Sequence, residues 1–591
     1  MKWVLSESDN VLVAALVDLA GLHPLIAKLM VNRGITDPSA ARAFLSCDLS
    51  TLSDPGIFSQ INKAVQRIHA AIAAAELIVV YGDYDVDGVT GASVLYLALK
   101  GLGARVESYI PDRMTEGYGL NVAALETLQQ KGAGLVISVD CGITALQQAE
   151  RARVLGLDLI ITDHHEFEHA AGSNGSGTSG ERKLPDAYAV LHPALVEPGV
   201  PDEIRESVSS LTGVGIAFKL VQALFATGSA REQALSSLDL VTLGTIADVG
   251  RITGENRVLV KHGLALLSSE TASQRPGIAA LKQVSRLNGK KIGVGVVGFS
   301  LAPRINASGR LERADAAFRM LTTDSQEEAF ELAASLDAVN KERQAVEECI
   351  LLDARQQCAG MDASASGALV LASEEWHPGV IGIVASRIVE EFYRPTALIS
   401  IKDGTGKGSA RSIPGFDLYA GLEACSDLLL GFGGHKYAAG FTIAQDAIPE
   451  FRERLSSLVL ERMGPKGFVR TLIVDSAVML EELTIDLMQE MEKLAPFGQG
   501  NPEPRLGARG LKVVSSRIVG NNHLKLRLQQ DGVSLDAIAF NRGGLLGNQV
   551  RDGARLAAVF TPRLNAWSGR TTVELEIRDL KTETSNSGIA S

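Results

Sequence analysis

Three short apolar runs in this chain each end in acidic or histidine residues. Short apolar runs separated by helical patterns are typical of buried strands in a parallel sheet. Ligands bind beyond the carboxyl ends of such strands, so the donors that follow them predict a divalent-metal cluster at one sheet edge. Such a cluster indicates a phosphate-ester or pyrophosphate hydrolase. The runs are 77–81, 134–139 and 157–161, followed by Asp83, Asp85 and Asp87, by Asp140, and by Asp163, His164 and His165.

The first acidic string places three aspartates at alternate positions. On an extended chain Asp83, Asp85 and Asp87 share one face, where their charges repel unless cations neutralise them. Gly88 then permits a tight turn into a helix predicted over 89–99. An EF-hand contains a similar string but needs Glu six residues beyond its Gly, and position 94 is Val. The string is therefore predicted to bind a metal at a strand end.

The histidine pair also follows a strand pattern, and no HExxH zinc motif is present. Imidazole beside several carboxylates suits Mn²⁺ or a similar ion better than Ca²⁺. A single buried histidine is usually a core residue. Here the pair begins 24 residues after Asp140, at the end of an adjacent strand, which favours a ligand. A last acid, Asp248, ends the helical run 238–247 and by itself would be interpreted as a surface residue.

Length and composition exclude several classes of protein. A chain of 591 residues is longer than one hydrophobic core supports, so we expect three or four domains. The 5 cysteines have no CxxC spacing and are expected to be reduced thiols of a cytoplasmic protein. No apolar run reaches membrane-spanning length, and the first residues lack the apolar region of a signal peptide. The net charge of -12 argues against an evenly basic surface for nucleic acid.

One region departs from this acidic balance. Residues 501–581 contain 13 Lys and Arg against 7 Asp and Glu, arranged in strand-like alternation such as Leu524-Lys525-Leu526-Arg527-Leu528. A basic all-β module is typical of an OB-type barrel that follows a nucleic-acid backbone. A solvated charged face explains the composition of this segment equally well, so the segment alone leaves both interpretations open.

Strings along most of the chain resemble those of a known enzyme group. GDYDVDG (82–88), SVDCG (138–142), TDHH (162–165) and GTIADV (244–249) resemble the DHH phosphoesterase superfamily. Further strings, from about His23 to the C-terminal β module, are similar to its bacterial exonucleases that degrade single-stranded DNA from 5′ to 3′. These strings are IPDR (110–113), EGYG (116–119), APRINASGRL (302–311), WHPGVIGIVASR (376–387), GKGSARS (406–412), GGHKYAAG (433–440) and PFGQGNPEP (496–504).

The resemblance implies an α/β fold in which a long helix joins the two lobes of a DHH-type core, with a mostly parallel sheet in the first lobe. A C-terminal OB-type β module follows. The clearest departure from the family is a Gly/Ser-rich insertion at 170–180. The expected divisions are an N-terminal helical segment 1–70, a catalytic domain 71–313, a connecting helix 314–357, a DHH-associated substrate-binding domain 358–465, the OB-type domain 466–582 and a disordered tail 583–591.

The resemblance also implies roles for the metal-site residues. Two divalent ions, Mn²⁺ or Mg²⁺, are expected to be bound by Asp83, Asp85, Asp140, His164 and Asp248. Asp140 and Asp248 are the expected shared ligands. Asp87 and His165 complete the catalytic set and are expected to support the ligands or contact phosphate.

Substrate contacts are expected mainly from arginines, because a guanidinium group pairs with phosphate through two hydrogen bonds. Each arginine by itself is also explained as an ordinary surface charge. The glycines of GKGS and GGHK are expected to let the backbone approach a phosphate or a base. The predicted substrate-binding residues are Arg113, Arg304, Asn306, Arg310, Arg387, Ser409, Arg411, Gly433, Gly434 and His435.

The predicted function is single-stranded-DNA-specific 5′-to-3′ exonuclease activity in DNA recombination and repair. The expected partners are single-stranded DNA, a single-strand-binding protein and a helicase, with no membrane, a monomeric state and a cytoplasmic location. Three alternatives stay open. A nanoRNase or cyclic-dinucleotide phosphodiesterase would use the same metal site, normally in a shorter chain without the basic β module. An inorganic pyrophosphatase acts on a compact substrate that needs no such module. A catalytically inactive replication scaffold would keep the fold alone.

The two lobes are expected to face each other across a groove too narrow for duplex DNA. The C-terminal module would add affinity for long strands through salt-sensitive phosphate contacts. Truncation after about Arg462 is therefore expected to impair action on long strands more than on short oligonucleotides.

Overall fold

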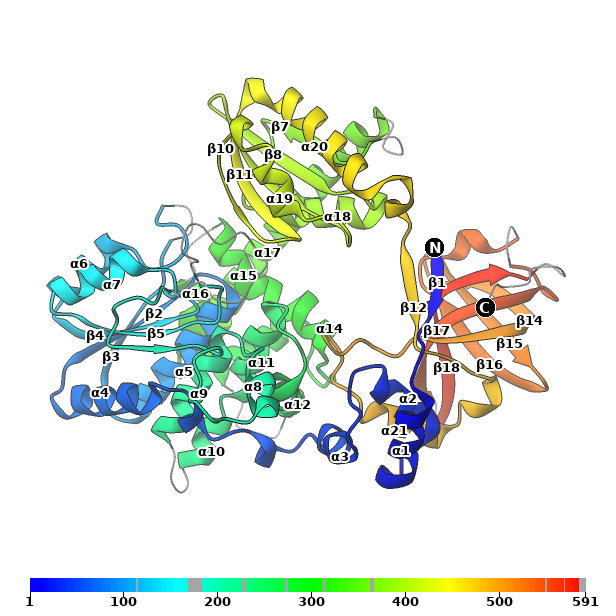
Figure 1. Ribbon diagram of the computed structural model, residues 1–591, viewed down its shortest axis with the longest axis horizontal. Coiled ribbons are helices and arrows are strands. Elements are labelled where there is room, and N and C mark those ends of the chain that lie inside the picture. Colours follow the sequence, from blue (N-terminus) through cyan, green and yellow to red (C-terminus); the bar gives the residue numbers. More distant parts are fainter. Residues whose placement is uncertain are drawn as a thin grey trace.

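The computed structural model describes the chain except for residues 113–114, 168–182, 226–229, 271–274, 312–314, 362–365, 548–549, 568 and 584–591. The predicted insertion 170–180, the tail from 584 and Arg113 lie outside the described residues. Figure 1 shows an α/β first lobe, a second lobe above it, and a β-barrel beside the first lobe with the N-terminal helices beneath. The predicted fold class, an α/β core followed by an OB-type β module, is confirmed.

The first lobe is built on a five-stranded parallel sheet in the order β3-β2-β4-β5-β6. β2 has β3 on one side and β4 on the other, so the strand order reverses there. In open parallel sheets this reversal opens a crevice at the carboxyl ends of the strands. The strands are β2 (Leu77–Gly82), β3 (Arg105–Tyr109), β4 (Ala133–Val139), β5 (Asp158–Thr162) and β6 (Ala189–Leu191).

Helices cover both faces of this sheet because alternate strand residues are apolar on each side. Ile78 and Val80 face one core, which includes α4, α5, α9 and α11, whereas Val79 and Tyr81 face α6 and α7. The helices of the first lobe up to residue 284, which include those that cover the sheet, are α4 (Ile61–Ala73), α5 (Val86–Gly101), α6 (Val122–Gln130), α7 (Leu146–Val154), α8 (Asp202–Val208), α9 (Gly213–Leu224), α10 (Ala230–Leu235), α11 (Leu238–Ala247), α12 (Gly254–Ser268) and α13 (Pro276–Val284).

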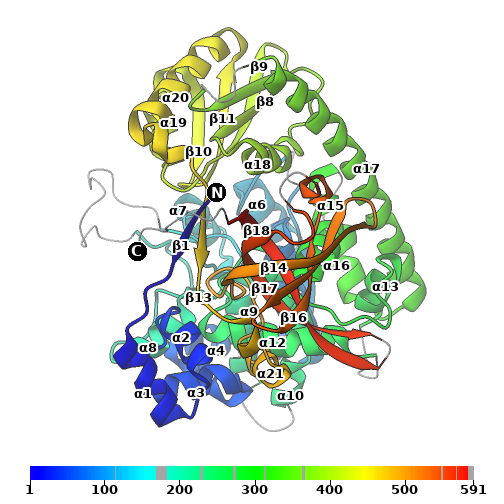
Figure 2. The same ribbon diagram turned by 90° about the vertical axis from the view of Figure 1, so that its right-hand side faces the viewer.

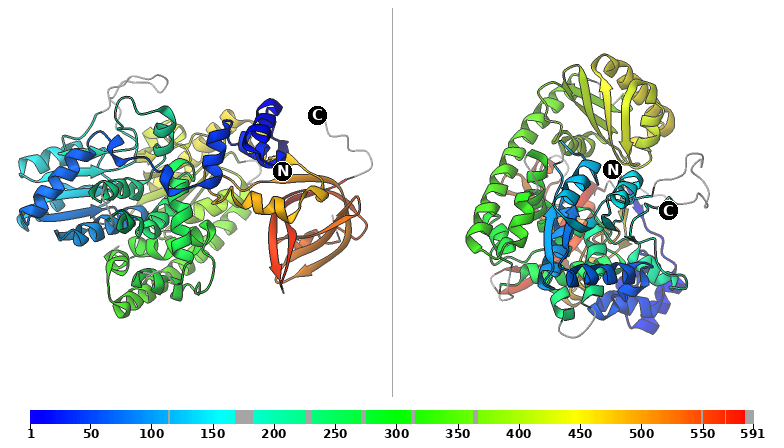
Figure 3. Two further views of the ribbon diagram at one scale, coloured as in Figure 1. Left: turned by 90° about the horizontal axis from the view of Figure 1, so that it is seen from below. Right: turned by 90° about the vertical axis from the view of Figure 1, so that its left-hand side faces the viewer.

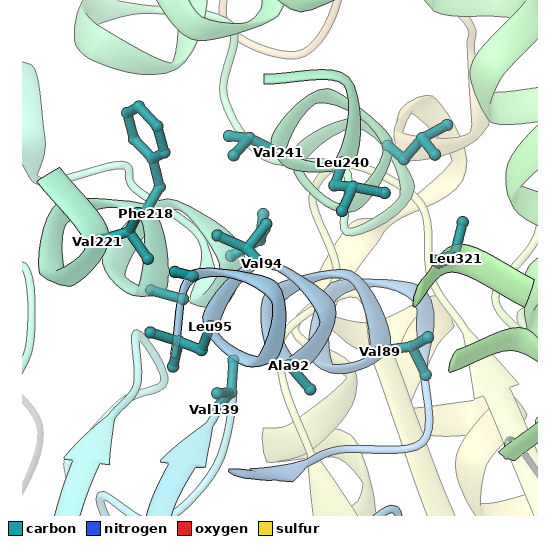
Figure 4. Packing of buried hydrophobic residues seen from close by; sticks show 14 of the residues in the cluster. Val89, Ala92, Val94, Leu95, Val139, Phe218, Val221, Leu240, Val241 and Leu321 are labelled. Atoms are coloured by element: carbon teal, nitrogen blue, oxygen red, sulfur yellow. The ribbon is translucent and has the colours of Figure 1, made fainter. Parts of the chain in front are cut away.

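Helix α5 is the centre of the larger core. Figure 4 shows it packed between β4, α9 and α11. Two glycines permit this close approach: a Cβ on Gly91 would lie 2.5 Å from a methyl group of Val139, and one on Gly244 would lie 2.3 Å from Thr90 Oγ1. Both distances are shorter than a van der Waals contact. The packing brings the N-terminal ends of α5 and α9 and the C-terminal end of α11 to the same sheet edge.

Among the described residues, no single helix is long and apolar enough to span a membrane. The pair α8 and α9 satisfies the length and composition criteria only when taken together, across a bend of 117°.

One long helix, α17 (Gln326–Ala359), leads from the first lobe to the second (Figure 2). The single helix predicted over 314–357 is instead two helices, since α16 (Asp315–Thr322) ends before it. Ser325 explains the break, because its side chain accepts a hydrogen bond from the Glu328 N–H and begins a new helix. Before α16, the helical run α14 (Val294–Val296) and α15 (Ala302–Leu311) encloses a π-helical turn, Val297–Leu301.

The second lobe contains a mixed sheet in the order β10-β11-β9-β8-β7. Within this sheet β7 and β8 run parallel, and the other pairs are antiparallel. Its elements are β7 (Leu369–Ser373), α18 (Ile381–Phe392), β8 (Thr396–Lys402), β9 (Thr405–Arg411), α19 (Leu418–Glu423), β10 (Leu429–Gly434), β11 (Ala438–Ala444) and α20 (Ile448–Met463).

The C-terminal module is a closed five-stranded barrel, because β14 pairs with both β15 and β17. The remaining pairs, β15–β16, β16–β18 and β17–β18, complete the ring. The barrel order matches the OB type. Its elements are β12 (Thr471–Val474), β13 (Ser476–Ala477), α21 (Ile485–Glu492), β14 (Leu506–Val519), β15 (His523–Gln530), β16 (Val533–Ala539), β17 (Arg555–Trp567) and β18 (Arg570–Thr582).

The N-terminal segment is divided between two bodies. Helices α1 (Asn10–Ala20), α2 (Pro24–Val31) and α3 (Pro38–Ser46) share one apolar core with the barrel and α21, whereas α4 belongs to the first lobe (Figure 3). Strand β1 (Lys2–Leu5) pairs with β12. Truncation after Arg462 would thus expose the apolar faces of α1–α3, so its effect would not be limited to strand capture.

Arg257 of α12 joins the first lobe to this C-terminal unit. Its guanidinium donates hydrogen bonds to the carbonyls of Phe44, Lys493 and Ala495 and stacks 3.6 Å from the Phe44 ring centre. The residue is only 2% exposed. Three carbonyls from two distant segments therefore depend on one buried side chain.

We expect Arg257→Met to weaken this junction by about 3 kcal/mol, because each carbonyl left without a donor costs about 1–3 kcal/mol. The first unfolding transition should move to lower temperature, and limited proteolysis should cut near residue 47 sooner. Arg231→Met, on an exposed part of α10, is the matched control. An unchanged first transition in Arg257→Met would show that the junction does not depend on this residue.

Candidate metal centre

The first acidic string follows the carboxyl end of β2, but the chain is not extended there as predicted. Helix α5 begins at Val86, so Asp85 caps it by accepting hydrogen bonds from the N–H groups of Asp87 and Gly88, at 2.8 and 3.1 Å. The three aspartates therefore do not share one face of an extended chain as predicted, because this capping hydrogen bond begins the helix within the string. Gly88 is required because the helix packs closely on the backbone of Asp83, and not because the chain turns there. A Cβ on Gly88 would lie 2.5 Å from Asp83 N.

Asp87 is buried and holds the N-terminal end of α9. Its carboxylate accepts hydrogen bonds from Gly213 N at 2.7 Å and Val214 N at 2.9 Å. Thr212 Oγ1 donates a third at 3.3 Å. These donors stabilise the carboxylate charge and fix α9 against the site. This geometry agrees with the predicted supporting role of Asp87.

Asp140 lies at the end of β4 with a left-handed backbone, at φ 62°. Its N–H donates to the Thr162 carbonyl of β5 at 2.9 Å. The side chain is buried against Gly213, where an added Cβ would lie 2.6 Å from Asp140 Cβ. The glycine at the start of α9 thus leaves the space that the Asp140 carboxylate occupies.

At the end of β5, Asp163 orients the histidine pair. Its Oδ1 accepts from the His164 N–H at 2.7 Å and lies 2.8 Å from His165 Nδ1. Its Oδ2 accepts from Ile143 N at 2.8 Å. Sequence reasoning missed this function of Asp163, although the residue stands in the TDHH string. Nothing in the string itself indicated that this carboxylate forms hydrogen bonds with the protein's own backbone and with His165.

His164 lies among carboxylates from three elements. Its Nε2 is 3.1 Å from Asp140 Oδ1, 3.7 Å from Asp248 Oδ2 and 3.8 Å from Asp87 Oδ2. Asp248 reaches the cluster because it directly follows α11, which packs on α5. The sheet edge and the end of α11 therefore bring all seven predicted catalytic residues together.

Three groups of these residues place their ligand atoms within 4.8 Å of one another. Asp140 and His164 each belong to two of the groups, whereas Asp248 belongs to one. The geometry thus supports Asp140 as a shared ligand and leaves a shared role of Asp248 a prediction. The groups are Asp83, Asp85 and Asp140; Asp87, His164 and Asp248; and Asp140, His164 and His165.

Burial gives the carboxyl groups of the cluster a raised affinity for protons. Burial, followed by repulsion from Asp85, raises the pKa of Asp83 to about 8 and that of Asp248 to about 7. Burial and neighbouring carboxylates also raise the pKa values of Asp87 and Asp140. Without a cation, this site therefore binds protons that ordinary surface carboxylates have lost.

The two histidines differ in charge. Burial, together with the neighbouring His165, lowers the pKa of His164 to about 4, so its ring is neutral and can be a metal ligand. Burial opposes the charge on His165 as well, but its hydrogen bond to Asp163 and the charge of that carboxylate raise its pKa to about 9. A protonated His165 favours an anion such as phosphate over a cation.

Three buried atoms in the cluster make no hydrogen bond of acceptable geometry: Asp83 Oδ1, Asp140 Oδ1 and His164 Nε2, although the last two lie 3.1 Å apart. Buried polar atoms are rarely left without a partner, and a bound ion is one common explanation. Two carboxylate oxygens and a neutral imidazole nitrogen form a donor set that Mn²⁺ accepts and Mg²⁺ tolerates. The residues therefore fit a divalent cation.

Tyr118 is a further residue that sequence reasoning did not single out. Its hydroxyl lies 3.1 Å from the Asp140 carbonyl and 3.0 Å from His165 Nδ1. The residue belongs to the EGYG string, which is part of the family resemblance. The string did not indicate that the tyrosine hydroxyl contacts the cluster. Its contact links the loop after β3 to the carboxyl ends of β4 and β5.

The predicted substrate residues of the helical region are only partly free. Arg304 Nε is 2.8 Å from Asp337 of α17, and Arg387 Nε is 2.8 Å from the buried Glu347 of the same helix. Both arginines therefore have protein partners, so a phosphate would have to share them. Asn306 has a buried Oδ1 without a partner. The side chain of Arg310 lies outside the described residues.

The second lobe brings the GKGSAR and GGHK strings into one sheet, on β9 and β10, with β11 between them. Strand pairing places Ser409 opposite Gly440, and Gly440 opposite Gly433. Arg411 donates to Ser409 Oγ at 3.2 Å, and His435 N donates to the Ala438 carbonyl. Gly434 has a φ of 140°, where a side chain would be strained.

An open hollow of about 440 Å³ lies over this part of the sheet. Its lining includes Pro378, Ile381, Lys407, Ser409, Phe432 and Phe441. An added Cβ on Gly431, which lines the hollow, or on Gly433 would meet nothing within 4 Å, so bare backbone is open here beside both polar and apolar side chains. The predicted approach of a ligand to these glycines is therefore sterically possible.

Comparisons with known proteins match the first lobe, the second lobe and the barrel in turn. Family models described as DHH family, N-terminal domain, as DHHA1 domain and as RecJ OB domain match residues 77–245, 365–461 and 474–579. The single-stranded-DNA-specific exonuclease RecJ of Bacillus subtilis (strain 168) is 38% identical, over 98% of this chain and 70% of that protein. RecJ of Dickeya dadantii (strain 3937) is 33% identical, over 95% and 96%.

A solved structure is similar over the whole chain. The crystal structure of RecJ in complex with Mn²⁺ from Thermus thermophilus has a TM-score of 0.79 and 30% identity, covering 100% of this chain and 81% of that one. Sequence, family models and three-dimensional structure agree on the same order of lobes and barrel. This chain therefore belongs to the RecJ family of the DHH phosphoesterase superfamily.

Proposed function

We propose that this chain is a metal-dependent exonuclease that hydrolyses single-stranded DNA from its 5′ end, in DNA repair and recombination. The observation that carries the proposal is the meeting of three unpartnered buried atoms, from Asp83, Asp140 and His164, in one carboxylate cluster. RecJ relatives described as single-stranded-DNA-specific exonucleases, and RecJ structures with Mn²⁺ and with Mg²⁺, support both the substrate and the ions.

Two divalent cations would supply an activated water and neutralise charge at the scissile phosphate. The residues that would hold them are Asp83, Asp85, Asp140, His164 and Asp248. Asp87 holds α9 in place through its three hydrogen bonds, and Asp163 holds the His165 ring. A protonated His165, favoured by its raised pKa, would donate a hydrogen bond to a phosphate oxygen beside the cluster.

The second lobe is the proposed binding surface for the strand end. Arg411 is oriented by hydrogen bonds to Ser409 Oγ and to the Ala410 carbonyl. Bare glycine backbone on the neighbouring strands lets a phosphate or a base lie close to the sheet. Contacts of this kind read backbone charge and base surface, which suits an enzyme without sequence preference.

We also propose that the protein acts as a cytoplasmic monomer with a helicase and a single-strand-binding protein. An enzyme restricted to single strands needs its substrate separated from the complementary strand, and these two partners provide and cover such strands. The division into domains at 71–313, 358–465 and 466–582 is proposed on the same family resemblance.

Removal of a ligand should abolish hydrolysis without unfolding the lobe. Asp140→Asn keeps a side chain that tolerates the left-handed backbone at this position, and His164→Gln keeps a polar group. Each should lower kcat for single-stranded DNA at least about 100-fold, since even residues that support ligands change metal affinity by about 10–100-fold. Asp202→Asn, exposed at the start of α8, is the control. Near-normal activity of Asp140→Asn or His164→Gln with Mn²⁺ would reject the site.

The cluster should also make stability depend on metal and pH together. Because the folded pKa values of Asp83 and Asp248 lie above the value of about 4 for an unfolded carboxyl, the folded chain binds more protons. Without metal, stability should therefore fall as pH rises from 6.5 to 8. Bound Mn²⁺ should remove most of this loss.

The measurement is the first thermal transition at pH 6.5 and 8, with EDTA and with Mn²⁺. His165, whose raised pKa acts in the same direction, is separated by repeating the series with Asp83→Asn, which should have a weaker pH dependence. An equal pH dependence with and without Mn²⁺ would contradict the assigned cation site.

Digestion of end-labelled DNA should give the direction and strand preference. A 5′ label on a single strand should be released at once, whereas a 3′ label should stay in long products until late. Blunt duplex of the same sequence should be degraded far more slowly. Early release of the 3′ label, or equal degradation of duplex DNA, would contradict this function.

A further inference from the structure

Phe299 is the most exposed of the large apolar residues in the described chain, at 87%. It lies in the π-helical turn between α14 and α15. A π-turn within a helix is rare and often marks a functional site. The same helical run continues into Arg304 and Asn306, which are predicted substrate residues. Packing within the described chain does not explain why a phenylalanine side chain is exposed to solvent at this position.

The turn lies next to the end of α11 that carries Asp248. The π-turn packs against α11, and a Cβ on Gly298 would lie 3.8 Å from Ile246 Cγ2. Val249, directly after Asp248, is 68% exposed and has a φ of 59°. A β-branched residue in this region is strained, and such strain gathers at functional sites. An exposed apolar residue, Val249, thus follows a predicted metal ligand, and the turn that carries Phe299 packs on the helix that ends at this ligand.

Exposed cations occur in the same stretches of the chain. Arg251 follows Val249 by two residues, and Lys290 and Lys291 precede Phe299 by nine and eight residues. Ile252 N donates to the Gln499 carbonyl, and Gly500 packs against the Arg251 side chain. Segment 249–252 therefore connects the carboxylate cluster to the segment that leads into the barrel. Figure 1 shows α14 on the side of the first lobe that faces the barrel.

We infer that Phe299 is a stacking platform for one nucleobase of the DNA strand between the barrel and the carboxylate cluster. The inference rests on the proposed function and adds a positioning residue to it. Every base has a π-face, so stacking holds a strand without reading its sequence. The exposed cations in these stretches of the chain suit the phosphates of such a strand, which favours a nucleic acid over an apolar protein partner.

The test compares Phe299→Ala, Phe299→Leu and Phe299→Trp with wild-type protein. Phe330→Ala is the matched control, since Phe330 is also an exposed phenylalanine, on α17. Affinity for a fluorescent single-stranded oligonucleotide is measured in EDTA, and KM and kcat are measured with Mn²⁺. Phe299→Ala should weaken binding about tenfold and raise KM more than it lowers kcat. Tryptophan should restore binding, leucine should not, and Phe330→Ala should match wild type.

A second series places a single abasic site at successive positions of the oligonucleotide. At one position the loss of the base should weaken binding to wild-type protein about tenfold but leave the affinity of Phe299→Ala unchanged. Equal losses in both proteins at every position would overturn the inference, as would wild-type affinity and KM in Phe299→Ala. Absence of nuclease activity in wild-type protein would instead reject the proposed function.

Discussion

The close packing of α5 against β4, α9 and α11 is the constraint on which the site depends. It brings carboxylates from separate elements to one edge of the sheet, where burial and mutual repulsion oppose their ionisation. Backbone N–H groups compensate only part of this effect, chiefly for Asp85 and Asp87. The atoms that keep no hydrogen-bond partner could bind a cation. Glycines 91, 213 and 244 are essential because any side chain there would separate the elements.

The arrangement of the three bodies follows from two connections of different kinds. Helix α17 extends from the first lobe to the second and provides acidic partners, Asp337 and Glu347, for arginines on both sides. The barrel is attached through buried contacts around Arg257 and the segment 498–500. Because α1–α3 share the barrel core, the two ends of the chain form one unit. These buried contacts attach the barrel to the lobe that carries the carboxylate cluster.

Most of the candidate site could be predicted from the sequence, because it depends on local patterns. The apolar runs predicted β2, β4 and β5, and the donors after them lie at one edge, as expected. Features that depend on contacts between distant segments were not predicted. The aspartate string begins a helix instead of extending a strand. Arg304 and Arg387 have carboxylate partners on α17, and their binding of phosphate stays a prediction. The roles of Asp163 and Tyr118 became evident only from their hydrogen bonds.

The sequence by itself determined the fold class, the strand ends and the chemical nature of the donors, because periodicity and residue type are local properties. The tertiary structure alone decided which carboxylates are held by backbone N–H groups and which keep oxygens free for a cation. It also decided that the first 46 residues belong with the barrel. Both features depend on packing between segments that are far apart in the chain. Such packing leaves no periodic pattern in the sequence of either segment, so it cannot be predicted from one segment alone.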